Sequence, residues 1–315
     1  MRAFALDAFG ETGSFRDLPI PEPGEGEVLV RVRSADVCTT DFAVMAGYMA
    51  AYFEHRFPLV PGIDAAGVVE RVGPGVDGFK PGDEVYGYQG RPIYQHGTLA
   101  EYVPLQARGI VHKPASLSFE QAGIIGHCAL TGSAAVAAGE LRPGQRVVLL
   151  GATGGVGSFA TQFARAAGAH VIGVTRPEHL EYAREMGSSE TIDYTVTDAV
   201  AAVSERYPDG VDVLIDLVGI QPLSAGMAEL VHEGGRVVSV VMPPDVEALA
   251  ARGVTGILTS RLATEHQLEQ ICSGVTDGSV KLPTIQAFPF DEIQAAYAMQ
   301  ATMHVQGKIA IAMAP

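Results

Sequence analysis

Apolar and polar positions follow two different rhythms along this chain of 315 residues. In the first third the period is about two residues: Glu27–Ser34 alternates apolar with polar side chains, which is typical of a half-buried strand. Segments rich in Pro and Gly, such as Pro19–Glu27 and Gly73–Gly87, predict close turns between strands. Further strands are expected at Met1–Leu6, Pro61–Val72 and Gly97–Val103. We expect this part to form a small, strongly bent barrel.

One helix interrupts this pattern. Ala35–Gly47 can form a short helix with Thr39 or Thr40 as its N-cap and with Asp41 in its first turn.

The rhythm changes near Ser118, which precedes Glu120 and Gln121 as expected of a helix start. Strands and helices then alternate, which predicts an α/β fold with a doubly wound parallel sheet. The expected strands cover residues 146–150, 170–175, 190–193, 211–216, 235–241 and 254–262, and the helices 155–168, 178–186, 197–206 and 223–230. After a helix over 264–275, a strand and a helix within 282–300 and a strand at 307–312 are expected to return to the first domain. The expected domains are therefore 1–117 with 263–315, and 118–262.

A glycine-rich turn lies between the strand Arg146–Leu150 and the following helix. Its glycines allow a tight turn and a close approach of the backbone to a pyrophosphate, whose charge rests on N–H groups at the helix terminus. The strand before it, the helix after it and a second strand at His170–Thr175 favour a dinucleotide site over a turn built only for backbone reasons. The candidate cofactor-binding residues here are Gly151, Gly154, Gly155, Val156 and Gly157.

Composition narrows the possible partners. The formal net charge is −15 and no basic patch stands out, so nucleic acid and anionic membranes are not expected partners. The apolar runs look too interrupted for a membrane span, and the first residues do not resemble a signal peptide. Three cysteines without a CxxC pair predict a reducing, cytoplasmic location.

Several segments together resemble the medium-chain dehydrogenase/reductase superfamily, and within it the zinc-free quinone oxidoreductase and zeta-crystallin branch. The resemblance implies a GroES-like β-barrel catalytic domain, a Rossmann domain and a homodimer built through the edge strands of the Rossmann sheets. The segments are Phe57–Gly87, Gly97–Val103, Lys113–Ala122, Ala129–Val136, Gly151–Gly157, Val211–Gly219 and Gly307–Ile311.

The cofactor is predicted to be NADPH. The second strand ends in Val174–Thr175–Arg176, without the acid that usually holds the ribose hydroxyls of NAD and with a guanidinium suited to a 2′-phosphate. Tyr194 resembles the family tyrosine that flanks this phosphate; Arg176 could instead be a solvated surface cation. The resemblance also places Thr131, Val218, Gly219 and Val240 near the cofactor, although each could equally serve core packing.

Zinc-containing members of the superfamily bind their catalytic metal with a Cys, a His-Glu pair and a later Cys. Here Cys38 matches the first position, but Ile63 and Asp64 replace the pair, and His127 falls at the later position. We expect no metal, because Ile63 removes a ligand. An unusual Cys/His/Asp site is the alternative.

Without a metal, a quinone or an α,β-unsaturated carbonyl (enone) is the expected substrate, since hydride adds to a conjugated carbon while charge develops on the distant oxygen. The apolar segment Met45–Arg56 suits a small hydrophobic substrate. The family tyrosine position holds Met49, so Tyr48 is the best candidate donor, and Tyr48 and Tyr52 could simply line the site. Thr40 and Asp41 are candidates for polar contacts near the nicotinamide, or for helix capping. The alternatives are a zinc-dependent alcohol dehydrogenase, a biosynthetic enoyl or imine reductase, and a non-catalytic NADPH-binding protein.

Overall fold

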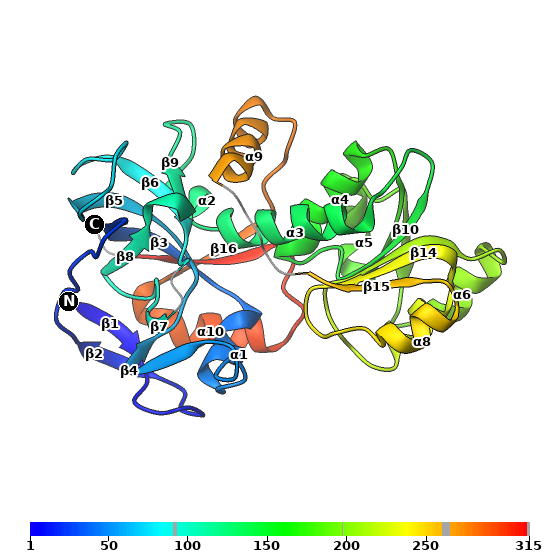
Figure 1. The fold of residues 1–315 in the computed structure, drawn as a ribbon, viewed down its shortest axis with the longest axis horizontal. Coiled ribbons are helices and arrows are strands. Elements are labelled where there is room, and N and C mark those ends of the chain that lie inside the picture. The colour runs from blue at the N-terminus through cyan, green and yellow to red at the C-terminus, as the bar shows by residue number, and fades with distance from the viewer. Residues whose placement is uncertain (91–92, 197, 260–264, 314–315) are drawn as a thin grey trace. The chain divides into compact units, whose positions relative to one another are not determined.

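The computed structural model describes residues 1–90, 93–196, 198–259 and 265–313. The chain forms two compact units, of which one is discontinuous in sequence (Figure 1). The first unit comprises Met1–His127, Ala263–Ser279 and Thr284–Pro315, and the second comprises Cys128–Leu262 and Val280–Pro283. Segments from both ends of the chain therefore belong to the first unit, as the sequence pattern predicts.

The first boundary lies ten residues later than the expected one after residue 117. The reason is α2 (Phe119–Ala122), which packs on β3 (Glu27–Val37) and β5 (Asp64–Val72) of the first unit. The helix start predicted at Ser118 is confirmed, and it forms a capping box: the Ser118 hydroxyl accepts from the N–H of Gln121 at 3.1 Å, and the Gln121 side chain accepts from the N–H of Ser118 at 2.9 Å. The later boundary, between residues 262 and 263, lies outside the described residues.

The first unit is built on a mostly antiparallel sheet in the order β16-β17-β3-β5-β6-β9, with β8 also paired to β3. Two further strand pairs, β1–β2 and β4–β7, flank it. The predicted strand-rich character of this part is confirmed. Its remaining strands are β1 (Arg2–Ala5), β2 (Ser14–Asp17), β4 (Glu54–Val60), β6 (Glu84–Tyr88), β7 (Ile93–His96), β8 (Tyr102–Gln106), β9 (Ile110–His112), β16 (Ile285–Pro289) and β17 (Lys308–Ala312). Its other helices are α1 (Thr39–Met45), α9 (Glu265–Asp277) and α10 (Ile293–Ala301).

The helix expected over Ala35–Gly47 is shorter than predicted. Strand β3 continues to Val37 because its end pairs with β17, a strand from the far end of the sequence. The N-cap is Cys38, so the prediction of Thr39 or Thr40 at this position is wrong. The strand expected from Pro61 begins only at Asp64, and the one expected at residues 97–103 lies at Tyr102–Gln106.

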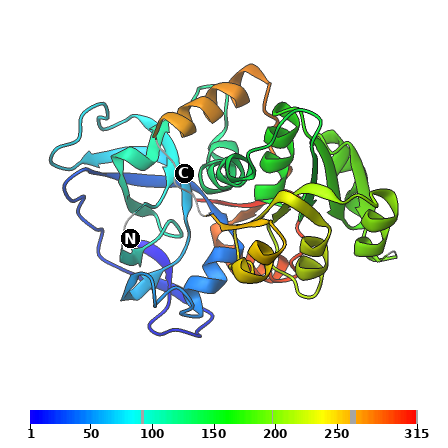
Figure 2. The ribbon, with the colours of Figure 1, turned by 45° about the vertical axis from the view of Figure 1, so that its right-hand side comes forward.

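The second unit contains a fully parallel sheet in the order β12-β11-β10-β13-β14-β15, which confirms the doubly wound prediction (Figure 2). The predicted strands 146–150, 170–175, 190–193 and 211–216 have the predicted bounds. The strands are β10 (Arg146–Leu150), β11 (His170–Thr175), β12 (Glu190–Asp193), β13 (Val211–Asp216), β14 (Val231–Ser239) and β15 (Thr255–Leu258). The helices are α3 (Gly126–Gly139, which begins in the first unit), α4 (Gly155–Ala166), α5 (Leu180–Glu185), α6 (Ala199–Arg206), α7 (Leu223–Glu229) and α8 (Val246–Ala251). Residues 197 and 260–264, parts of the segments predicted at 197–206, 254–262 and 264–275, lie outside the described residues.

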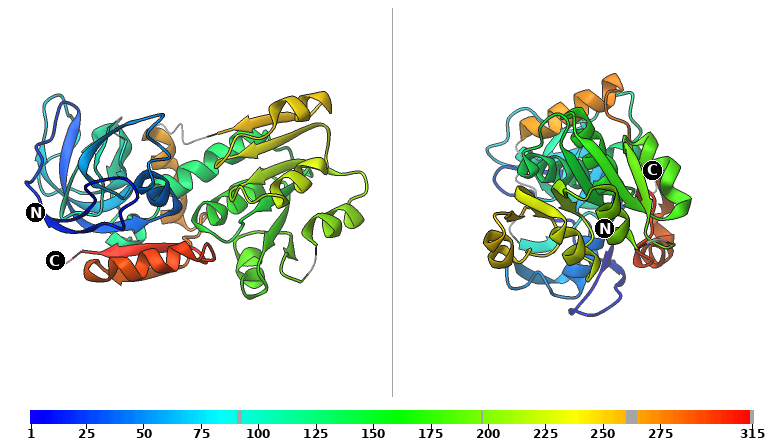
Figure 3. Two further views of the ribbon diagram at one scale, coloured as in Figure 1. Left: turned by 90° about the horizontal axis from the view of Figure 1, so that it is seen from below. Right: turned by 90° about the vertical axis from the view of Figure 1, so that its right-hand side faces the viewer.

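Both faces of this sheet are buried, because apolar side chains along β10 alternate between two cores. Val147 and Leu149 pack with residues of α3 and α4, whereas Val148 and Leu150 pack with residues of α6, α7 and α8. Figure 3 shows the ribbon of this unit, green to yellow, with helices on both sides of the sheet. The turns that follow β10, β11 and β13 are therefore attached to a sheet that is buried on both faces.

By length and composition alone, the stretch Phe119–Gly139 is long and apolar enough to cross a membrane, contrary to the expectation from the interrupted apolar runs. The stretch is divided between two helices, since α2 ends at Ala122 and α3 begins at Gly126. Of its apolar 18-residue window, 72% is buried inside the protein, as in a core helix.

Candidate active site

The turn between β10 and α4 requires glycine at two positions. Gly151 has a φ of +80°, and a Cβ there would lie 2.7 Å from a methyl carbon of Val218. A Cβ on Gly157 would lie 2.0 Å from the carbonyl oxygen of Gly151. Glycine therefore lets α4 start directly against the turn, as predicted for a dinucleotide site.

The N-terminus of α4 fits a phosphate group. Its N-cap is Gly154, and no side chain caps the helix. The first N–H groups of this twelve-residue helix point out of its positive end, where an anion is stabilised by hydrogen bonds and by the helix dipole. Gly155 and Val156 are half-buried at this end. The residues present thus fit the pyrophosphate of a dinucleotide.

Arg176 follows the end of β11 and Tyr194 the end of β12, close enough for the guanidinium to act on the phenol. The Tyr194 N–H donates to the carbonyl oxygen of Thr175 at 3.3 Å, and the buried Thr175 hydroxyl bonds to that of Thr153 at 2.8 Å. Burial raises the pKa of the Tyr194 phenol, the guanidinium of Arg176 lowers it, and the carboxylates of Glu178 and Asp193 raise it.

Glu178, which the sequence analysis did not single out, contacts Arg176. Its Oε1 lies 3.0 Å from the Arg176 Nε. The residue follows Pro177 at the start of a short 3-10 helix, Pro177–His179. An acid three residues beyond the strand end is visible in the sequence, but the direction of its side chain depends on this turn.

Asp216, at the end of β13, organises a second turn of the site. Its Oδ1 accepts from the N–H groups of Val218 and Gly219, both at 2.9 Å, and its carbonyl oxygen accepts from the Val240 N–H at 3.2 Å. One carboxylate therefore fixes the turn that the resemblance places near the adenosine. The sequence signal was an acid at a strand end.

Thr131 lies on α3 and is buried. Its Oγ1 has no hydrogen-bond partner among the residues that the structure describes. A buried hydroxyl without a partner is costly, and a bound ligand would satisfy it.

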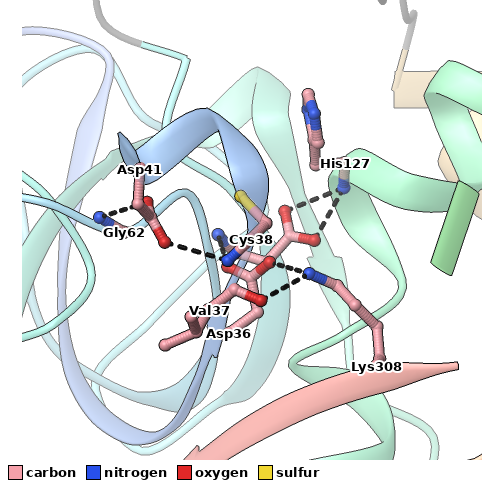
Figure 4. Close-up of polar contacts among 8 residues, drawn as sticks. Asp36, Val37, Cys38, Asp41, Gly62, His127 and Lys308 are labelled. Atoms are coloured by element: carbon pink, nitrogen blue, oxygen red, sulfur yellow. Dashed lines mark hydrogen bonds and ion pairs between the residues drawn. The ribbon is translucent and has the colours of Figure 1, made fainter. Parts of the chain in front are cut away.

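In the first unit, buried charges form a chain of contacts (Figure 4). The Lys308 ammonium on β17 pairs with the Asp36 carboxylate and donates to the carbonyl oxygen of Val37 at 3.2 Å. Asp36 also accepts from the Asp64 N–H at 2.9 Å, and both carboxylate oxygens of Asp64 accept from the His127 N–H at 2.8 Å. These contacts join β17, β3, β5 and the start of α3.

Asp41 is fully buried, and backbone N–H groups engage both of its oxygens. Cys38 donates to it at 2.9 Å and Gly62 at 3.0 Å (Figure 4). Burial, with the nearby Asp36 carboxylate, raises the pKa of Asp41 to about 7, while the two N–H groups and Lys308 act to lower it. The geometry matches the capping role that the sequence left open. A contact of Asp41 with the nicotinamide stays a prediction.

Tyr48 and Tyr52 lie in turns after α1, with 77% and 78% of their surface exposed, and Thr40 is half-buried on α1. The groups that donate to the Asp41 carboxylate are the backbone N–H groups of Cys38 and Gly62, not these side chains. Nearby aromatic rings form a cluster, which we call the aromatic patch: Phe9, Phe53, His55, Phe57 and Tyr94, with ring centroids 5.0 to 5.3 Å apart in successive pairs.

The donors near Cys38 do not fit a tetrahedral zinc site. Ile63 is buried where the zinc-binding members have a histidine, and both oxygens of Asp64 are engaged by a backbone N–H. Within the described parts of the chain, no group of three or more His, Cys, Asp or Glu side chains could hold a metal ion.

Comparison with known proteins identifies the family. Residues 24–115 match the alcohol dehydrogenase GroES-like domain, and residues 155–264 match the zinc-binding dehydrogenase family. A zinc-type alcohol dehydrogenase-like protein of Schizosaccharomyces pombe is 31% identical over 91% of this chain and 90% of its own length. An NADPH-dependent alkenal/one oxidoreductase of Arabidopsis thaliana is 29% identical over 99% of this chain and 79% of its own length. The solved quinone oxidoreductase of Coxiella burnetii is 26% identical, with a TM-score of 0.89 and 99% coverage of both chains.

The two domains and the glycine turn define the class of protein: a two-domain oxidoreductase that uses a nicotinamide cofactor. The chain belongs to the medium-chain dehydrogenase/reductase superfamily, in its quinone oxidoreductase-like branch.

Proposed function

We propose that this protein reduces a quinone or an enone with NADPH and without a metal. The observation that carries the cofactor part is Arg176 at the end of β11, beside Tyr194, where an NAD-preferring fold has an acid. The poor fit of Ile63 and Asp64 to a zinc site supports the metal-free part.

The chain's own residues bind and orient the cofactor. The open N-terminus of α4 holds the pyrophosphate, the turn fixed by Asp216 holds the adenosine, and the Thr131 hydroxyl gains a partner. When bound, the reduced nicotinamide supplies the hydride.

The proposed substrate class follows from the charge that hydrogen-bond donors can stabilise without a metal. In a conjugated substrate, hydride adds to the distant carbon, the electron pair moves to the oxygen, and a proton from solvent or a hydroxyl completes the reduction. Tyr48 is the candidate donor because it directly precedes Met49, which occupies the family tyrosine position, and its phenol is accessible. The aromatic patch supports a small hydrophobic substrate, because exposed rings bury apolar surface against a planar ring or enone.

The test is NADPH oxidation measured against quinones, enones, enoyl thioesters, aldehydes and imines. Turnover on quinones or enones is expected, and Tyr48→Phe should lower kcat, while Tyr102→Phe, a control at a half-buried tyrosine of β8 outside the candidate site, should not. Tight NADPH binding without turnover on any class would point to a non-catalytic protein. Stoichiometric zinc in protein purified without a histidine tag would overturn the metal-free mechanism.

We also propose a homodimer formed through β15. This strand is at the edge of the parallel sheet, and β14 is its pairing partner among the described strands. Exposed apolar side chains surround it: Val241, Met242, Val246 and Leu258. An open edge with apolar neighbours favours pairing with a second copy. Light scattering should show a dimer that Leu258→Lys dissociates, whereas Val196→Lys, an exposed apolar site just after the opposite edge strand, should leave it intact.

A further inference from the structure

The guanidinium that is suited to a 2′-phosphate already has an anionic neighbour. Arg176 Nε and Glu178 Oε1 are 3.0 Å apart, and their side chains are 34% and 51% exposed. The Nε makes no aligned hydrogen bond, so the contact is one of charge. Pro177, between the two residues, restricts the backbone of the short turn that brings them together.

The surroundings of this pair are more acidic than basic. Asp193, at the end of the neighbouring strand β12, raises the pKa of Tyr194 as Glu178 does, so both carboxylates lie within electrostatic range of the same phenol. Asp193 also accepts from the backbone N–H and the hydroxyl of Thr195, at 2.8 and 2.7 Å, which holds it at this position. A 2′-phosphate beside Arg176 would therefore lie next to the Glu178 carboxylate, with the Asp193 carboxylate in the same region.

We propose that Glu178 determines coenzyme specificity by competing with the 2′-phosphate for Arg176, so that the protein discriminates only moderately between NADPH and NADH. The proposal rests on the proposed role of Arg176 in cofactor binding. To pair with Arg176, the phosphate must displace the Glu178 carboxylate or accept its repulsion. NADH has no 2′-phosphate, so the Glu178 carboxylate does not repel it. The carboxylate can instead accept hydrogen bonds from the ribose hydroxyls of NADH.

The expected effects are moderate, because both side chains are partly exposed and solvent screens them. Glu178→Gln should tighten NADPH binding by about three- to ten-fold. It should leave NADH binding unchanged or weaken it by about two-fold, since the amide oxygen of Gln still accepts a hydrogen bond. The affinity ratio of the two coenzymes is therefore the sensitive measurement.

The experiment measures dissociation constants by titration calorimetry for NADPH, NADH and adenosine 2′,5′-bisphosphate. The proteins are the wild type, Glu178→Gln, Arg176→Ala and the double variant, with Glu181→Gln as the control. Glu181 is an exposed acid on α5, so its substitution makes the same change in net charge three residues away. Thermal unfolding of each variant establishes that it is folded.

Tighter binding of NADPH and of the bisphosphate to Glu178→Gln, with no change for Glu181→Gln, is the expected result. The gain should be smaller in the Arg176→Ala background, because Glu178 then has no guanidinium to occupy and only its direct repulsion of the phosphate is relieved. Equal affinity ratios in the wild type and Glu178→Gln would overturn this inference. If Arg176→Ala leaves the ratio unchanged, the proposed NADPH role of Arg176 fails instead, so the two failures are distinguishable.

Discussion

Substitution of Asp41 by asparagine should change how the stability of the first unit depends on pH. In the folded protein the Asp41 pKa is raised to about 7 from an ordinary value of 3.8, chiefly because burial disfavours the charged form. The folded state therefore binds the proton more tightly than the unfolded chain. The contribution of this group to stability is fully present below pH 3.8, and it is lost as the pH rises to about 7.

The magnitude follows from the size of the shift. A difference of about three pKa units corresponds to about 4 kcal/mol, lost at about 1.4 kcal/mol for each pH unit. Asparagine does not titrate, but its amide nitrogen must face the N–H of either Cys38 or Gly62. One buried donor is then unpaired, which costs about 1–3 kcal/mol at every pH. The variant should be less stable than the wild type in acid and no less stable above neutral pH.

Urea unfolding followed by circular dichroism at a series of pH values from acid to mildly alkaline tests this. Asp77→Asn is the control, because Asp77 is an exposed residue of a turn and its replacement should leave the wild-type curve unchanged in shape. The free energies of unfolding of the wild type and Asp41→Asn should converge as the pH rises. A constant difference between them at every pH would refute the reasoning.

Three other substitutions test separate parts of the structure. Lys308→Met leaves the buried Asp36 carboxylate without its cation. It should lower the free energy of unfolding, measured with urea, by about 3–5 kcal/mol. A decrease of only about 0.5 kcal/mol, as is usual for an exposed residue, would contradict this. Gly157→Ala forces a Cβ to within 2.0 Å of a carbonyl oxygen and should cost at least about 1–3 kcal/mol. Gly154→Ala, whose Cβ would meet its nearest atom at 3.7 Å, should cost at most about 1 kcal/mol, because alanine is a poorer N-cap than glycine. Thr131→Val should weaken NADPH binding by about two- to ten-fold without lowering stability, since the hydroxyl has no partner within the protein; unchanged affinity would argue against cofactor contact.

The parallel sheet could be predicted from sequence because each of its strands is local and strongly patterned. Arg146–Leu150 and His170–Thr175 are runs of apolar, β-branched residues next to glycine turns, and their bounds are those expected. Strand β14 begins four residues earlier than predicted, and α8 was not predicted. The prediction places the strand start at Gly235, because glycines are typical of a turn before a strand. In the structure, Gly234 and Gly235 lie inside β14.

The first unit was harder to predict because its contacts are distant in sequence. That β3 continues to Val37 depends on β17, about 270 residues later, and no local pattern could indicate it. The same holds for the site: the glycines could be named from the sequence, but the partner of Arg176 depends on how one short turn directs Glu178. Asp36 and Lys308 were not singled out because neither acquires significance until the other is brought beside it.

The place of β17 between β16 and β3 has a consequence for biosynthesis. On the ribosome, the second unit emerges almost entirely as one continuous segment and can fold as soon as it is complete. The N-terminal portion must wait with an open sheet edge at β3 and an uncompensated aspartate until the last strand of the chain is released. We expect nascent chains that end before Lys308 to depend on chaperones in a way that the finished protein does not.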